Sequence, residues 1–191
     1  MELLLQIDKF NDQVNGDGLT DEDKESIKKH IGFENIDAVE CVNIGPGADL
    51  IVILTVINLA VDIFLIGSKV IDGFEGWLKL GKKLRNLTKR SEIVSIDNDG
   101  ATILAIEYIS QHEMIDSLRK TNEMIINLAD VSGMIPANKQ GLASKPHNYY
   151  IKAFEVNDDK TYVVGIKSTG EVNLIKCFCF NPYGITECNF K

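Results

Sequence analysis

The residues whose spacing is most suggestive of chemistry lie near the start of the chain, in the stretch VNGDGLTDEDKE. Asn15, Asp17 and Asp21 have the spacing of three ligand positions in an EF-hand calcium loop, with a glycine at the turn position. Two positions do not fit, because Gln13 replaces the first aspartate and Lys24 replaces the bidentate glutamate. These three residues are the metal-ligand candidates that the sequence offers, but we expect a glycine-rich turn before a helix and no bound metal.

Two further motifs resemble binding or catalytic sequences without completing them. IGPGADL lies between a predicted strand and a predicted helix, but Pro46 removes a backbone donor and Asp49 would repel phosphate. HEMID matches the first half of a zinc-protease motif, but Asp116 stands where the second histidine is needed. We expect Asp49 to cap a helix, and Glu113 and Asp116 to lie in the first turn of another. No nucleophile motif is present, so the sequence indicates neither an enzyme nor a cofactor.

Three of the four cysteines are concentrated near the C-terminus, at Cys177, Cys179 and Cys188, while Cys41 is far away in sequence. Together with His147 they could form a zinc site. However, residues two apart in a strand point to the same side, and inward cysteines are more often part of a core. We therefore expect reduced, buried thiols in a cytoplasmic protein.

Composition places the chain among globular proteins and excludes one class of partner. The 191 residues are 45% hydrophobic and 25% charged, which suits one folded domain or a domain with an appendage. The net charge of −8 argues against a nucleic-acid binder, whose phosphate contacts need a basic face. The first residues lack the basic region of a signal peptide, so none is expected.

Charge is unevenly distributed along the sequence. Residues 1–49 contain twelve acidic and four basic residues, whereas residues 69–90 contain seven basic and two acidic residues. An acidic head, an apolar stretch and a basic segment therefore follow one another. The basic segment Lys79–Arg90 suits contact with an anionic membrane or an acidic partner. A solvated helix face is the alternative interpretation.

The acidic head is expected to form a β-α-β arrangement. Residues 3–7 form a short apolar run typical of a strand. Thr20, followed three residues later by an acid, predicts a capping box, and an i, i+4 isoleucine pair gives the helix an apolar stripe. Gly32 stands where the helix should end, and residues 35–44 read as a second strand.

A long helix is expected over residues 49–90. Its first part, Leu50–Ile66, is almost continuously apolar, and its polar residues recur at intervals of three, four or seven. Such a helix would be about 60 Å long. Its glycines, Gly76 and Gly81 among them, favour a kink or a break into two helices.

The same apolar run leaves a membrane interpretation open. It is long and hydrophobic enough to pass the usual criterion for a span, and Trp77 would lie at the interface. Asn58 and Asp62 oppose insertion, since a central aspartate costs about 3 kcal/mol. A helix buried in protein, or one that lines an oligomer, accommodates this polar stripe better.

The remaining residues, 91–191, are expected to form an α+β unit. The pattern predicts a hairpin over residues 92–109 and a helix over residues 111–130. After a loop, three strands are expected at 149–156, 161–168 and 171–180.

We therefore predict an α+β protein with a small β-α-β N-terminal part, a long central helix that is continuous or broken, and a C-terminal antiparallel sheet with one helix. Its units would be residues 1–47, 48–90 and 91–191, or a single integrated domain. The predicted function is non-enzymatic binding of a protein partner or homo-oligomerisation, including inhibitors that mask a partner. The alternative is a membrane-associated protein that inserts the Leu50–Ile66 helix. The predicted contact residues are Leu54, Asn58, Asp62, Phe74, Trp77, Lys79, Lys82, Lys83 and Arg85.

Overall fold

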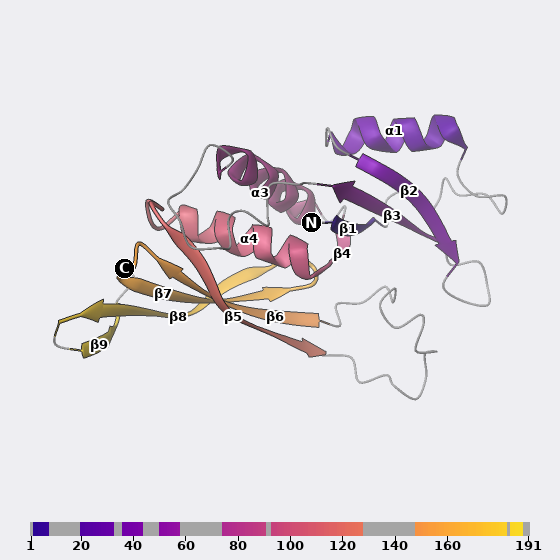
Figure 1. The fold of residues 1–191 in the computed structure, drawn as a ribbon. Helices are drawn as coiled ribbons and strands as arrows, with labels where there is room; N and C mark the ends of the chain where they lie inside the picture. The colour runs from indigo at the N-terminus through magenta and orange to yellow at the C-terminus, as the bar shows by residue number, and fades with distance from the viewer. Residues whose placement is uncertain are drawn as a thin grey trace.

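The computed structural model describes residues 2–7, 20–32, 36–43, 50–57, 74–90, 93–127, 148–182 and 184–188. Within these ranges, three helices accompany a four-stranded and a five-stranded antiparallel sheet (Figure 1). The helices are α1 (Asp21–Ile31), α3 (Phe74–Lys89) and α4 (Asn98–Ser110). The strands are β1 (Glu2–Ile7), β2 (Ile36–Asn43), β3 (Leu50–Ile57), β4 (Ile93–Ile96), β5 (Leu118–Asn127), β6 (Asn148–Val156), β7 (Lys160–Lys167), β8 (Val172–Asn181) and β9 (Gly184–Glu187). The predicted α+β class is confirmed.

The four-stranded sheet has the strand order β2-β3-β1-β4. Because β3 lies between β1 and β2, the two strands of the predicted β-α-β head do not pair with each other. β4 pairs with the other side of β1. The sheet thus draws strands from all three predicted units, residues 1–47, 48–90 and 91–191.

The helix predicted over residues 49–90 is wrong in its first part, because Leu50–Ile57 forms β3. A strand paired on both sides is often apolar on both faces, so its sequence lacks the alternation that identifies a half-buried strand. The many β-branched residues of this stretch suit an extended backbone. The later part is helical as α3, which continues through Gly76 and Gly81 without a break.

The signals predicted for α1 are confirmed. The hydroxyl oxygen of Thr20 accepts a hydrogen bond from the Asp23 backbone N–H, and the Asp23 carboxylate accepts one from the Thr20 backbone N–H at 3.0 Å. Gly32 ends the helix in the left-handed conformation, with φ of 70°. Ile27 and Ile31 are both buried. Local capping and one apolar stripe therefore define this helix.

The hairpin predicted over residues 92–109 is wrong, since β4 is followed directly by α4. Asp97, expected in a turn, caps the helix through a 2.7 Å hydrogen bond from the Gly100 backbone N–H to its carboxylate. Nine of the thirteen residues of α4 are buried. A helix surrounded by protein loses the polar–apolar period, so its sequence resembles that of a buried strand.

The helix predicted over residues 111–130 is also wrong. Glu113 and Asp116 lie in the connection between α4 and β5, and Leu118–Asn127 pairs with β6 along its length. Apolar residues at helical spacing suggested the wrong element, because the ladder with β6 outweighs a weak helical preference.

The five-stranded sheet has the sequential order β5-β6-β7-β8-β9. The three strands predicted at 149–156, 161–168 and 171–180 are confirmed as β6, β7 and β8. The sequence identifies them because polar turns separate three short runs that are rich in apolar and β-branched residues.

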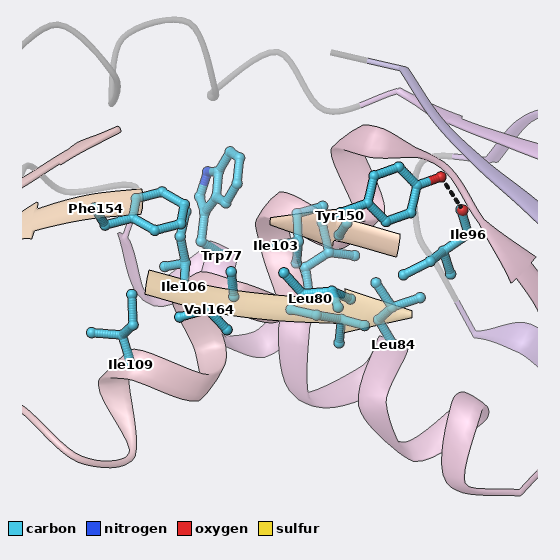
Figure 2. Packing of buried hydrophobic residues seen from close by; sticks show 14 of the residues in the cluster. Trp77, Leu80, Leu84, Ile96, Ile103, Ile106, Ile109, Tyr150, Phe154 and Val164 are labelled. Carbon is cyan, nitrogen blue, oxygen red and sulfur yellow. Dashed lines mark hydrogen bonds between the residues drawn. The ribbon is translucent and has the colours of Figure 1, made fainter. Parts of the chain in front are cut away.

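α4 joins the two sheets. It contacts β1 and β4 of one sheet and β6, β7 and β8 of the other, and α3 packs against it. Figure 2 shows this core: Trp77, Leu80 and Leu84 from α3, Ile103, Ile106 and Ile109 from α4, and Tyr150, Phe154 and Val164 from the larger sheet. The Tyr150 hydroxyl donates a 3.0 Å hydrogen bond to the Ile96 carbonyl, which ties β6 to β4.

Candidate functional site

The two faces of the five-stranded sheet have different surroundings. α3 and α4 lie on one side of the sheet, here called the inner face (Figure 1). In β6 the side chains of Tyr150, Phe154 and Val156 are buried on this face, while the alternate positions are half-buried. Among the described helices, none covers the opposite side, here called the outer face. The outer face is therefore a surface at which a binding site could lie.

Apolar side chains run across the outer face from β5 to β9. Residues opposite each other in neighbouring strands share a face, so the register identifies the set. It comprises Met124, Ile126, Ile151, Ala153, Val163, Phe178, Phe180 and Ile185. Met124 is 58% exposed, Phe180 43% and Ile185 66%. A contiguous apolar patch of this kind typically marks an interaction surface.

The charges on the outer face and at its border occur as pairs of opposite sign; Lys176, for example, lies opposite Val163 in the neighbouring strand. Arg119 pairs with Glu155 at one end, and Lys176 pairs with Glu187 at 2.7 Å near the other. Lys167 pairs with Glu171. Because these charges neutralise one another, the face does not select a partner of strong charge.

Tyr149 closes one part of the outer face over Gly165. Its hydroxyl donates a 3.0 Å hydrogen bond to the Asn173 side chain across β7. A Cβ atom on Gly165 would lie 1.8 Å from this hydroxyl. The glycine therefore lets the tyrosine ring lie across the sheet, which keeps the surface even at this position.

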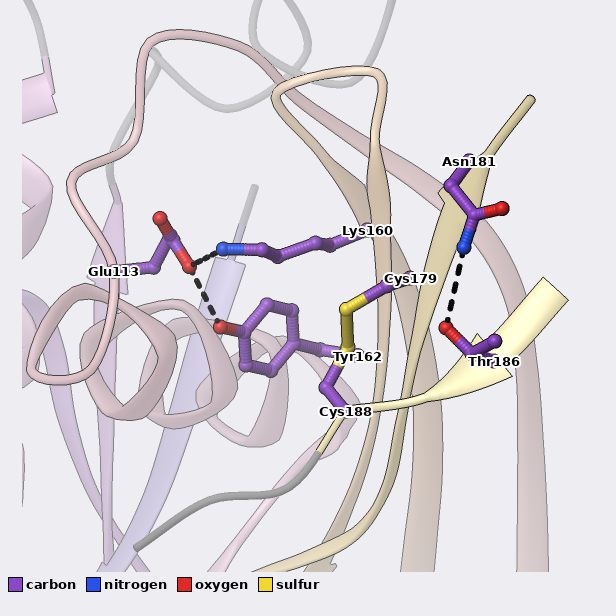
Figure 3. The surroundings of a disulfide bond; sticks show 7 residues. All are labelled: Glu113, Lys160, Tyr162, Cys179, Asn181, Thr186 and Cys188. Atoms are coloured by element: carbon purple, nitrogen blue, oxygen red, sulfur yellow. Dashed lines mark hydrogen bonds and ion pairs between the residues drawn. A yellow bond between two sulfur atoms is a disulfide. The ribbon is translucent and has the colours of Figure 1, made fainter. Parts of the chain in front are cut away.

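A disulfide bond holds the β9 edge of the outer face. Cys179 in β8 is bonded to Cys188, which follows β9 (Figure 3). The expectation that these thiols are reduced is therefore wrong, and one argument for a cytoplasmic location is removed with it. Cys177 is buried and unbonded, and burial raises the pKa of its thiol, so it stays protonated at neutral pH.

We expect the Cys179→Ala, Cys188→Ala double variant to lose about 2 kcal/mol of unfolding free energy, because the bond closes a short loop onto an otherwise exposed strand. Urea denaturation with and without reductant measures the loss. Reductant should destabilise the wild type by the same amount and leave the variant unchanged. A wild type that does not respond to complete reduction would contradict this role.

A buried lysine lies on the inner face. Lys152 is 0% exposed, and its ammonium group donates hydrogen bonds to Asn98 at 2.7 Å and to the Glu123 carboxylate at 2.9 Å. Burial lowers the pKa of Lys152, although Glu123 opposes this effect. The pKa of Glu123 is lowered to about 2, chiefly by hydrogen bonds from Lys120 and Lys152. Lys152 does not reach solvent, so it serves the fold rather than a ligand.

A second polar cluster surrounds Glu113 (Figure 3). Its carboxylate accepts a 2.5 Å hydrogen bond from Lys160 and a 3.1 Å hydrogen bond from the Tyr162 hydroxyl. The hydrogen bond from Lys160 lowers the pKa of Glu113, and burial raises the pKa of Tyr162. These partners anchor the α4–β5 connection to β7, so each polar group has a structural role.

The structure does not gather the predicted contact residues into one surface. Leu54 belongs to β3, and Asn58 and Asp62 lie outside the described residues. Trp77 is 2% exposed and faces the core, while Phe74 is half-buried and packs against the core.

The predicted basic residues all lie on α3 but have different environments. Lys79 and Lys82 are exposed. Lys83 donates a 2.8 Å hydrogen bond to the Gly32 carbonyl at the end of α1, and Arg85 pairs with Glu107. Two of the four basic side chains therefore make contacts within the chain.

The metal-ligand candidates are not brought together in the described part of the chain. Asp21 is the first residue of α1 and pairs with Lys24 at 3.2 Å, while Asn15 and Asp17 lie outside the described residues. Among the residues that the structure describes, no group of three His, Cys, Asp or Glu side chains could hold a metal ion. No described helix combines the length and apolar character needed to cross a membrane.

Sequence reasoning missed the outer face. A signal was present, because β6, β7 and β8 carry apolar residues at odd as well as even positions, for example Ile151, Val163 and Phe178. Strands of this kind have two apolar faces, and only one is covered by α4. Comparisons with protein-family models, with curated proteins and with solved structures found no match for the chain.

Proposed function

We propose that this protein is a self-associating binding protein whose contact surface is the outer face of the five-stranded sheet. The observation that carries the proposal is the set of exposed and half-buried apolar side chains from Met124 to Ile185 on a sheet face that no described helix covers. Hydrophobic faces of two antiparallel sheets pack against each other at about 10 Å in sandwiches. A second copy supplies such a face.

The size and charge of the face support a second copy as the occupant. Strand spacing and length give a face of about 500 Å², so two copies would bury about 1,000 Å², near the lower limit for specific interfaces. The bordering ion pairs carry no net charge, so two faces do not repel. The acidic first turn of α1 lies far from β8 and β9 in Figure 1.

The test is the molar mass in solution over about 1 to 200 µM, by light scattering or sedimentation. We expect a concentration-dependent dimer, and Ile126→Lys or Phe180→Lys should raise its dissociation constant at least about tenfold, because each buries an unpaired charge. Lysine makes the chain less negative, so lost association would not result from added repulsion. Met114→Lys is the matched control, because Met114 is 80% exposed but lies before the sheet.

Two results would overturn the proposal. One is a wild type that stays monomeric over the whole range. The other is a dimer that Met114→Lys weakens as much as the two variants on the outer face. The membrane alternative requires Leu50–Ile66 to be a helix, whereas Leu50–Ile57 is a strand paired with β1 and β2.

A further inference from the structure

A cavity of about 540 Å³ lies apart from the outer face, where α3 and α4 end beside the β7–β8 turn. Its walls include Arg85 and Lys89 from α3, Glu107 from α4, and Gly170 and Val172 from the turn and the start of β8. The volume falls within the range of small-molecule sites, about 300–1,000 Å³. Neither the disulfide nor the outer face accounts for it.

A buried carboxylate positions a cation in this cavity. Glu107 is 3% exposed, and its two oxygens accept hydrogen bonds from Nη1 of Arg85 at 3.0 and 3.3 Å. Nε2 of Gln111 donates to the same carboxylate. A guanidinium carries five N–H donors, so those on Nε and Nη2 of Arg85 are left for a ligand. The hydrogen bonds with Glu107 hold the Arg85 guanidinium in one orientation in the cavity wall.

The turn that forms the opposite wall is fixed in place. Gly170 has a φ of +87°, and a Cβ atom there would lie 2.3 Å from Cγ2 of Thr88 on α3. The Gly170 backbone N–H donates to the Lys167 carbonyl, and the Lys167 N–H donates to the Glu171 carbonyl. Only glycine permits this conformation and this close approach. The cavity is therefore formed before any ligand binds.

The charges of the lining indicate the class of ligand. Glu107 is neutralised by Arg85, and Glu171 is paired with Lys167, whereas Lys89 adds a second cation one helical turn after Arg85. The carbonyl ends of α3 and α4 would disfavour an anion. However, one carbonyl at the end of α4, that of Glu107, accepts a hydrogen bond from the Ser110 hydroxyl within the same helix.

The geometry points to a site for a small carboxylic acid with an apolar body. Its carboxylate would contact Arg85 and Lys89, since a guanidinium binds carboxylates through paired hydrogen bonds. Its apolar body would lie against Val172, the ring of Tyr108 and the side chain of Thr88. This site is independent of the self-association proposed above.

Calorimetric titration with benzoate, octanoate and 4-phenylbutyrate tests the inference, with 4-phenylbutyramide as the neutral control. At least one of the three acids should bind. If 4-phenylbutyrate binds, its amide should bind at least about tenfold more weakly, because the amide has no charge to pair with Arg85 and Lys89. If octanoate or benzoate binds instead, the amide of that acid is the neutral control. No binding by any of the three acids, or equal binding of acid and amide, would overturn the inference.

Variants locate the binding within the molecule. Lys89→Gln should weaken binding of the acid at least about fivefold, and Val172→Phe should also weaken it by placing a ring where the apolar body of the acid lies. Lys89 is exposed, so Lys89→Gln should leave the fold intact, and the urea midpoint of Val172→Phe checks that its half-buried position tolerates the larger ring. Lys82→Gln is the matched control, because Lys82 is exposed on α3 and does not line the cavity. Binding that is unaffected by Lys89→Gln and Val172→Phe would place the ligand elsewhere and contradict the site.

Discussion

We expect Glu123→Gln to lower the free energy of unfolding by about 3 kcal/mol at neutral pH, whereas Lys152→Met should change it by less than about 1 kcal/mol. Both substitutions break the same ion pair. Lys152 is 0% exposed, so loss of the carboxylate charge leaves an ammonium group buried beside neutral partners, with only the more distant Asp99 as a counter-charge on its own side. The Glu123 side chain is 38% exposed, so loss of the ammonium leaves a carboxylate that water and Lys120 can stabilise.

The pKa shifts of Lys152 and Glu123 are in keeping with this difference, in which the lysine is fully buried and the glutamate is partly exposed. The pKa of Lys152 is lowered because burial of the ammonium outweighs its attraction to Glu123. The pKa of Glu123 is lowered from 4.5 to about 2, because the hydrogen bonds from Lys120 and Lys152 outweigh the opposing effect of its partial burial. The stabilisation from Glu123 is therefore fully present above about pH 4.5 and is lost as the pH falls through about 2.

Urea denaturation from about pH 7 to about pH 2 measures both effects. The free energy of unfolding of the wild type should fall over the acidic part of this range. That of Glu123→Gln should fall less, because this variant has no carboxylate at position 123 to protonate. Lys152→Met serves as the matched control for removal of the pair. Equal destabilisation by the two substitutions at neutral pH would contradict the proposed asymmetry.

The elements that the sequence predicts correctly are those whose signals are local. Thr20 and Gly32 mark the ends of α1 through backbone geometry that depends on a few neighbours. β6, β7 and β8 are short runs rich in apolar and β-branched residues, and polar turns separate them. In both cases the signal lies within a few residues of the element, so it does not depend on distant contacts.

The elements that the sequence predicts wrongly are those whose conformation depends on distant residues. β3 is paired on both sides and α4 is buried on nearly all sides, so neither retains a period that separates strand from helix. β5 becomes a strand through its ladder with β6. The same argument explains why the outer face and the Cys179–Cys188 bond were missed, because each exists only once the sheet has formed.

The candidate cavity combines residues that sequence reasoning treated separately. Arg85 was predicted to contact a membrane or a partner, but its guanidinium is held by Glu107, a residue in a segment predicted to be a strand. Only the crossing of α3 over α4 brings them together. Gly81 lies at the closest approach of the two helices, against Glu107 and Ile103.

We expect Gly81→Leu to lower the free energy of unfolding by about 3 kcal/mol, whereas Gly76→Ala in the same helix should raise it by about 0.5 kcal/mol. A Cβ atom on Gly81 would lie 2.6 Å from Cβ of Glu107 and 3.4 Å from the Ile103 carbonyl oxygen, so a larger side chain must separate α3 from α4. Gly76 is exposed and has nothing within 4 Å of such an atom, so alanine there only reduces the freedom of the unfolded chain.

Urea denaturation of the two variants and the wild type gives both values. Gly81→Leu should also displace Glu107 and with it the guanidinium of Arg85, so the fraction that remains folded should lose affinity for carboxylic acids. Gly76→Ala should leave that affinity unchanged, because Gly76 does not line the cavity. Opposite signs for two glycine substitutions in one helix would show that close approach of α3 and α4, rather than helix propensity, determines what position 81 tolerates. Destabilisation by both variants to the same degree would show instead that glycine is needed along the whole of α3.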